Sequence, residues 1–74
     1  MCRVGITTDP YTRRQYWAAQ HPTLRNWEIV SAHDAKDAAE WAAHRLSQER
    51  DCSGVDVDAA PPTPSAWHVY IFEY

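Results

Sequence analysis

Apolar and polar residues alternate at three places in the chain, and this alternation predicts three strands. The first is a β-branched segment, Cys2–Thr8, and the second is Trp27–Ala32. The third, Trp67–Tyr74, has the strongest strand propensity. In that last strand one face carries Trp67, Val69 and Ile71, and the other carries His68, Tyr70, Phe72 and Tyr74.

A helix is predicted from Pro10 to about Gln20. Asp9 is a good N-cap residue, and Pro10 suits the first helical position, where its missing N–H is not needed. Pro22 ends the helix, because the residue before a proline avoids helical angles.

A second helix is predicted from Ala35 to about Arg50, with Asp34 as its N-cap. Small and apolar residues at helical spacing predict its buried seam, which comprises Ala35, Ala39, Ala42 and Leu46.

Residues 53–66 contain Gly, Asp and Pro and predict a loop before the last strand. Its three prolines, Pro61, Pro62 and Pro64, favour an extended, polyproline-like connector. The element order is then β-α-β-α-loop-β. We therefore expect one α+β domain over residues 1–74, a small three-stranded mixed or antiparallel sheet packed with two helices.

The composition is that of a small globular domain, with 74 residues of which 45% are apolar. Eleven alanines bury little surface, so the aromatic residues are expected to supply much of the core. No apolar run approaches the roughly 20 residues that span a membrane, and the N-terminus lacks the apolar stretch of a signal peptide. These features predict a cytoplasmic protein that does not engage a membrane.

Charge is distributed unevenly along the chain. The net charge is −3, which disfavours a general nucleic-acid binder. The first third nevertheless has one carboxylate, Asp9, against four arginines: Arg3, Arg13, Arg14 and Arg25. This basic third is a candidate nucleic-acid-binding surface, and an ordinary mixed surface is the alternative.

The two cysteines, Cys2 and Cys52, lie far apart in the sequence and form no CxxC pair. Disulfide scaffolds of this size usually have more cysteines, so both are predicted to be reduced. The four histidines and two cysteines also lack the paired spacing of a zinc site.

The segment Val4–Arg14 resembles the second half of the GIY-YIG endonuclease signature. In that family a strand containing a conserved glycine leads into a helix, with an arginine eight residues after the glycine. Gly5 and Arg13 have this spacing. The segment Asp37–His44 is similar to the family's later helix, with Glu40 in place of its metal-binding glutamate.

The family's first strand has no counterpart before residue 2. The last strand resembles it, with Tyr70 in place of the family's tyrosine, which suggests a circular permutation. Two positions depart from the family pattern, because Arg3 replaces a tyrosine and His68 replaces a glycine.

The resemblance implies a catalytic group of Arg13, Glu40 and Tyr70. Glu40 would hold Mg²⁺ or Mn²⁺, Arg13 would stabilise charge on a phosphate, and Tyr70 would help to activate water. Because the motif is incomplete and the chain acidic, we expect a non-catalytic or weakly active binding protein derived from a nuclease fold. A minimal metal-dependent endonuclease acting on nucleic-acid phosphodiesters is the alternative.

Each of these residues also has a structural interpretation. Arg13 is placed to pack its stem on Trp17, and Glu40 to pair with Lys36 or His44. Gly5 would let a helix approach the strand closely. The aromatic residues of the last strand are candidates for the core, for a protein partner or for a homodimer contact.

Overall fold

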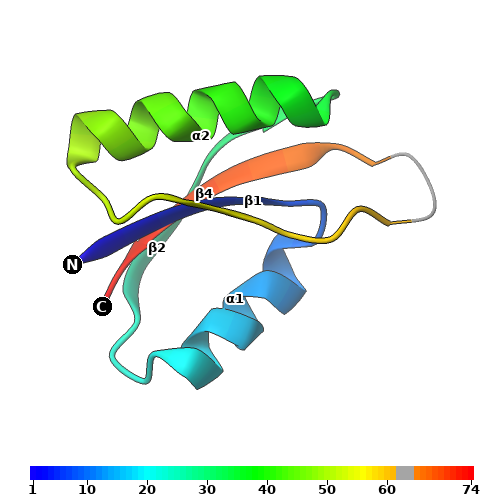
Figure 1. The fold of residues 1–74 in the computed structure, drawn as a ribbon. Helices are drawn as coiled ribbons and strands as arrows, with labels where there is room; N and C mark the ends of the chain where they lie inside the picture. The colour runs from blue at the N-terminus through cyan, green and yellow to red at the C-terminus, as the bar shows by residue number, and fades with distance from the viewer. Residues whose placement is uncertain (62–64) are drawn as a thin grey trace.

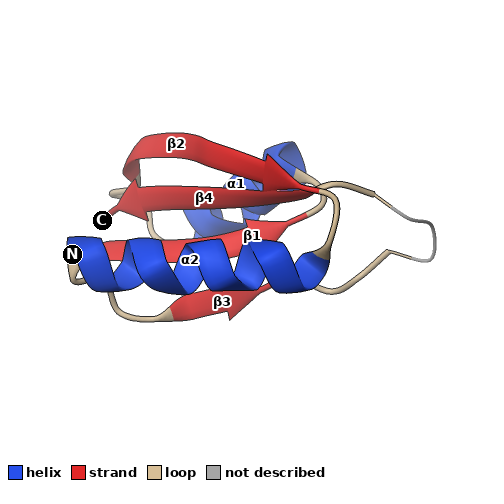
Figure 2. Ribbon diagram, turned by 90° about the horizontal axis from the view of Figure 1, so that it is seen from above, coloured by secondary structure: helices blue, strands red, loops and turns tan. Residues whose placement is uncertain are grey.

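A four-stranded sheet with one helix on each face forms the protein (Figures 1 and 2). The computed structural model describes residues 1–61 and 65–74. Its elements, in chain order, are β1 (Cys2–Thr7), α1 (Pro10–Gln20), β2 (Arg25–His33), α2 (Lys36–Arg50), β3 (Val55–Val57) and β4 (Trp67–Glu73).

The strand order in the sheet is β2-β4-β1-β3. β4 pairs antiparallel with both β1 and β2, while β1 pairs parallel with β3. The α+β class and the two helices are confirmed. The predicted sheet of three strands lacks one strand. Val55–Val57, within the predicted loop 53–66, pairs with β1 as an edge strand. Pro62 and Pro64 of the predicted polyproline segment lie outside the described residues.

The two faces of β4 build two separate cores, as its alternation predicts. On the α2 side, Trp67, Val69 and Ile71 pack with β1 and with two alanines of α2. On the α1 side, Tyr70 and Phe72 pack with Trp17, and partly buried Leu24, Trp27 and Tyr74 surround them. The aromatic strand is therefore interior to the sheet. It offers no free edge, and its aromatic side chains from Trp67 to Phe72 are buried rather than presented to a partner.

The predicted start of α1 is confirmed. The carboxylate of Asp9 accepts hydrogen bonds from the Thr12 backbone N–H (3.2 Å) and the Thr12 hydroxyl (2.8 Å). These bonds lower the pKa of Asp9, because they stabilise its ionised form. Pro10 occupies the first turn, and the helix ends where the N–H of His21 donates to the carbonyl of Trp17.

The start and rotation of α2 differ from the prediction. The N-cap is Ala35, which has no side-chain capping bond, so Asp34 lies one residue too early to cap. The buried positions are Ala39, Ala43 and Ser47, while Ala42 and Leu46 are only partly buried. The helix thus presents a narrower seam of small side chains, rotated from the predicted one, which allows close packing on Val4 and Ile6 of β1.

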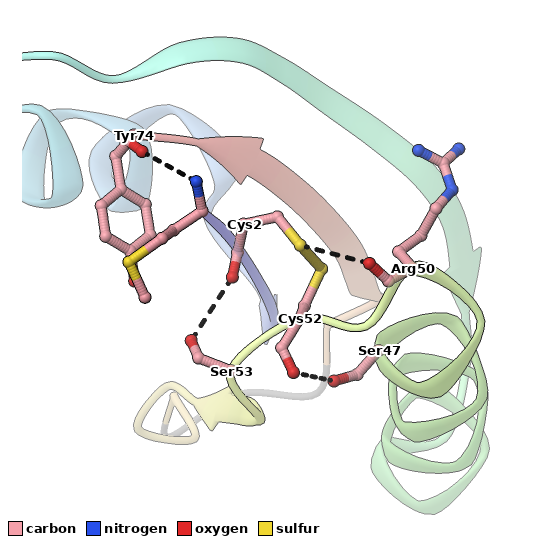
Figure 3. The surroundings of a disulfide bond; sticks show 7 residues. Cys2, Ser47, Arg50, Cys52, Ser53 and Tyr74 are labelled. Atoms are coloured by element: carbon pink, nitrogen blue, oxygen red, sulfur yellow. Dashed lines mark hydrogen bonds between the residues drawn. A yellow bond between two sulfur atoms is a disulfide. The ribbon is translucent and has the colours of Figure 1, made fainter.

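Cys2 and Cys52 form a disulfide, so the prediction of two reduced cysteines is wrong (Figure 3). Although 50 residues separate them, β1 begins beside the turn that follows α2, and their Cα atoms lie 4.9 Å apart. The surrounding backbone is held as well, because the backbone N–H of Ser53 donates to the carbonyl of Cys2 (3.2 Å). The disulfide therefore ties the start of β1 to the end of α2.

The two chain ends lie side by side. The backbone N–H of Tyr74 donates to the carbonyl of Met1 (3.0 Å). The N-terminal amine donates to the carbonyl of Tyr74 (3.2 Å), as Figure 3 shows. In the described part of the chain, neither helix has the length and apolar character needed to cross a membrane.

Reduction of the disulfide is expected to lower the free energy of unfolding. Closing a loop of 50 residues restricts the unfolded chain, which corresponds to about 4 kcal/mol of stabilisation. Urea unfolding with and without a reductant measures the difference. A Cys2→Ser/Cys52→Ser variant should match the reduced protein and show no response to reductant; equal stability of oxidised and reduced wild-type protein would contradict the expectation.

Candidate functional site

Gly5 and Tyr70 face each other across the central pair of strands. They are direct antiparallel partners in the β1–β4 ladder. A Cβ atom added to Gly5 would overlap the hydroxyl oxygen and the ring of the Tyr70 side chain. The absence of a side chain at residue 5 therefore lets the Tyr70 ring lie directly over the β1 backbone. The close approach that Gly5 permits is that of a tyrosine, and not of a helix.

The Tyr70 hydroxyl is held inside the protein. It accepts a hydrogen bond of 2.8 Å from the indole Nε1–H of Trp17, and the Tyr70 side chain is fully buried. Burial raises the pKa of Tyr70, although Trp17 and Arg13 partly offset this by favouring the ionised form. A phenol in this position remains protonated and sequestered from bulk solvent.

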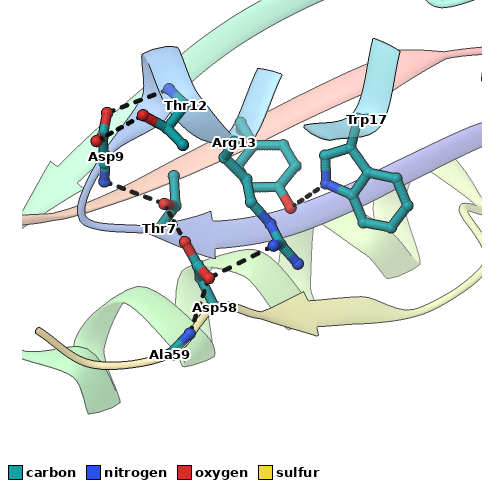
Figure 4. Close-up of polar contacts among 8 residues, drawn as sticks. Thr7, Asp9, Thr12, Arg13, Trp17, Asp58 and Ala59 are labelled. Atoms are coloured by element: carbon teal, nitrogen blue, oxygen red, sulfur yellow. Dashed lines mark hydrogen bonds and ion pairs between the residues drawn. The ribbon is translucent and has the colours of Figure 1, made fainter. Parts of the chain in front are cut away.

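Arg13 extends from α1 toward the same cluster (Figure 4). Its guanidinium lies 4.3 Å from the ring centroid of Tyr16 and 5.4 Å from that of Trp17. It also forms an ion pair of 3.4 Å with Asp58, which follows β3. Thr7 donates a 2.8 Å hydrogen bond to Asp58, so this carboxylate links β1, α1 and the end of β3. Arg13 lies beside Trp17 as the structural interpretation expects, but it is a largely buried, ion-paired residue whose guanidinium faces the ring, and not a solvated residue that packs its stem there.

Arg3 makes contacts similar to those of Arg13, with an aspartate and with the ring of Trp17. Its guanidinium donates to Asp56 of β3 at 2.8 Å and lies 4.9 Å from the centroid of Trp17. The hydrogen bond with Asp56 is the main reason that the pKa of Arg3 is raised, so the guanidinium stays charged. Trp17 consequently lies against two arginines, and each of these has its own aspartate.

The other two arginines of the predicted basic surface lie apart from this cluster. Arg14 lines a shallow hollow of about 330 Å³ on α1, together with Tyr11 and His21. Arg25, at the start of β2, is 3.9 Å from the carboxylate of Glu73. The structure thus brings together Arg3 and Arg13 but not all four.

Glu40 lies on the opposite side of the sheet from Arg13 and Tyr70. It belongs to α2, which packs on the Val69 face of β4, whereas Tyr70 belongs to the face under α1 (Figure 1). Its carboxylate is 3.8 Å from Lys36 in an i, i+4 pair, which confirms the structural interpretation of this residue. Glu40 therefore does not join the other two residues of the predicted catalytic group.

The donor set does not favour an intrinsic divalent-metal site. Within residues 1–61 and 65–74, no group of three or more His, Cys, Asp or Glu side chains is arranged to hold a metal ion. Mg²⁺ is usually held by carboxylates together with phosphate oxygens. Asp56 and Asp58, the carboxylates nearest the arginines, are already engaged in ion pairs.

Sequence reasoning missed the two aspartates that complete the cluster. Their signal was the strict alternation of Val55, Asp56, Val57 and Asp58, which is the period of a strand with one polar face. The neighbouring Gly54 and the prolines that follow favoured a loop instead.

Comparisons with protein-family models, with curated proteins and with solved structures find no match to this chain.

Gly5→Ala is expected to destabilise the protein by about 1–3 kcal/mol, because the added methyl group would overlap the Tyr70 side chain in a packed core. Chemical denaturation measures this loss. A Tyr70→Ala background provides the control, since removing the ring should remove most of the penalty for Gly5→Ala. A penalty of equal size in both backgrounds would show that the ring is not its cause.

The free energy of unfolding is expected to fall as the pH rises above about 10, the ordinary pKa of tyrosine. In this range the unfolded chain loses the Tyr70 proton while the folded protein keeps it, because burial raises the folded-state pKa. The unfolded state then binds fewer protons, so stability decreases with pH. Denaturation at several alkaline pH values tests this, and Tyr70→Phe should show a weaker dependence. An identical slope in Tyr70→Phe would assign the effect to other groups.

Proposed function

We propose that this chain is a non-catalytic, protein-binding domain with a fold like that of the GIY-YIG endonucleases. One observation carries the proposal: the three residues expected to perform catalysis each have a structural partner instead. Tyr70 is bonded to Trp17, Arg13 is paired with Asp58, and Glu40 is paired with Lys36.

The buried tyrosine argues against nuclease chemistry. A group that helps to activate water has to reach that water, directly or through one bridging molecule. The Tyr70 hydroxyl lies between the β1 backbone and the Trp17 indole, and the Tyr70 side chain has no exposed surface. Its raised pKa further disfavours an ionised, proton-accepting form.

The charge arrangement favours a protein partner over nucleic acid. Affinity for a phosphate backbone depends on arginines and lysines that neutralise phosphates. Three of the four arginines in the basic third lie close to carboxylates, namely Asp56, Asp58 and Glu73. Large apolar side chains remain exposed at the same time, among them Val30 and Trp41. Aromatic side chains of this kind are enriched in protein interfaces.

The relationship to the nuclease fold is supported by the placement of β4. A permuted arrangement requires the last strand to lie beside the Gly5 strand, and β4 pairs antiparallel with β1 with Tyr70 opposite Gly5. It also requires adjacent termini, and Met1 and Tyr74 are joined by backbone hydrogen bonds. Arg13 follows on the next helix and reaches the same face of the sheet.

A minimal metal-dependent endonuclease is the second candidate. The observation in its favour is that Gly5, Arg13 and Tyr70 meet on one face of the sheet, as the resemblance implies. It would need Mg²⁺ or Mn²⁺, and Glu40 would have to act from the opposite face. That separation makes it the weaker candidate.

The cytoplasmic location predicted from the sequence would agree with two reduced cysteines, and the structure does not provide that agreement. Cys2 and Cys52 are bonded, and disulfides persist mainly in oxidising compartments. The binding function proposed above does not depend on whether the protein is in the cytoplasm or in an oxidising compartment.

The purified protein is expected not to cleave labelled DNA or RNA in the presence of Mg²⁺ or Mn²⁺. It is also expected to show no salt-sensitive binding in fluorescence anisotropy, because three of the four arginines of the basic third lie beside carboxylates. Glu40→Gln and Arg13→Lys serve as matched controls, since the first removes the carboxylate charge at constant size and the second keeps the positive charge but removes the guanidinium. Cleavage by the wild-type protein that either substitution abolishes would establish the endonuclease and overturn the proposal. Binding that weakens with salt, without cleavage, would favour nucleic acid as the partner.

A further inference from the structure

The outer surface of α2 carries a short stripe of negative, aromatic and positive side chains. Asp37, Trp41 and Arg45 follow one another at i, i+4 and i+8, so they lie along one side of the helix. Trp41 is 65% exposed, and the Arg45 guanidinium lies 4.8 Å from its ring centroid. An indole exposed to this extent leaves a large apolar surface in water.

A groove runs beside this stripe, between α2 and β2. It has a volume of about 240 Å³, and its walls include Val30, Trp41, Leu46 and Val69. Val30 is 43% exposed. In Figure 2, α2 lies over β1 and leaves the edge strand β2 uncovered, on the side where this groove lies.

The charges of the stripe are complementary to those of a second, antiparallel copy of the stripe. With a rise of about 1.5 Å per residue, Asp37 and Arg45 lie about 6 Å from Trp41 along the helix axis in opposite directions. Two antiparallel copies that cross at Trp41 therefore place each Asp37 beside the Arg45 of the other copy. A two-fold axis makes both contacts at once, as an isologous interface requires.

We propose that the stripe and its groove form an interface with a second copy of this chain. The two α2 helices run antiparallel, each Trp41 enters the groove of the other copy, and two Asp37–Arg45 pairs flank the indoles. This proposal rests on the protein-binding function proposed above and names the partner. Burial of an aromatic anchor in a pocket with complementary charges at its rim is the usual anatomy of a specific interface.

Pairing through the free edge of β2 is a less suitable route to the same dimer. The register of β2 against β4 shifts twice, between Arg25 and Glu28 and between Ile29 and Ser31. Such irregularities interrupt the row of backbone donors and acceptors and disfavour addition of another strand. The side chain of Val30 on β2 remains exposed, and it lines the groove.

The molecular mass of the oxidised wild-type protein should rise from monomer to dimer with increasing concentration in analytical ultracentrifugation. Trp41→Ala should weaken the dimer by at least about tenfold, because it removes the central anchor. Tyr11→Ala is the matched control, since Tyr11 is 74% exposed on the opposite helix. It should leave the association unchanged. Circular dichroism verifies that each variant is folded.

Charge exchange tests the antiparallel geometry. Asp37→Arg and Arg45→Asp should each weaken the homodimer by at least about tenfold, because each places like charges beside each other twice. The double variant Asp37→Arg/Arg45→Asp should restore it. An equimolar mixture of the two single variants should associate as well, since every contact between the two chains again joins opposite charges.

A wild-type protein that stays monomeric at high concentration would overturn the proposed dimer. A dimer that is unaffected by Trp41→Ala, or one that neither the double variant nor the mixture restores, would overturn the proposed surface. These results are independent of the nuclease assay, in which cleavage would overturn the protein-binding function itself.

Discussion

The contact between Gly5 and the Tyr70 ring is the constraint on which the α1 side of the structure depends. Because residue 5 has no side chain, the ring lies over the β1 backbone. Its hydroxyl then reaches the indole of Trp17, which fixes the position of α1 on the sheet. Arg3 and Arg13 in turn lie against Trp17. One missing side chain in β1 therefore determines where a helix, a tryptophan and two arginines can lie.

The same contact explains why Tyr70 is part of the protein interior. A tyrosine that fills the space above a glycine supports packing, and it loses its access to water at the same time. The short strand β3 and the residue that follows it place Asp56 and Asp58 beside Arg3 and Arg13. Positive charge that could otherwise attract phosphate is then neutralised within the molecule, and the polar network links β1, α1 and β3.

The sequence predicted correctly those features that depend on residues close together in the chain. The Asp9–Pro10 start of α1 and the two faces of β4 follow from capping and from alternation, and both are confirmed. The missed features depend on residues distant in sequence. β3 has three residues and exists as a strand through its parallel pairing with β1, and the disulfide depends on a contact across 50 residues. Glu40 and Tyr70 are separated because α2 lies on one face of the sheet and the Tyr70 side chain on the other. The periodicity within one helix does not determine which face of the sheet that helix covers.

The division of the sheet into an aromatic face under α1 and a largely aliphatic face under α2 also determines what α2 leaves exposed. Ala39 and Ala43 allow α2 to approach Val4 and Ile6 closely, so the helix lies over the centre of the sheet rather than over β2. A larger residue at either alanine would lift the helix and alter its cover of the sheet. The close approach thus turns Trp41 toward solvent beside an uncovered edge strand. The exposed indole is a consequence of how the core is packed, and an aromatic ring left exposed for that reason gains most from association when the flanking charges select a single orientation.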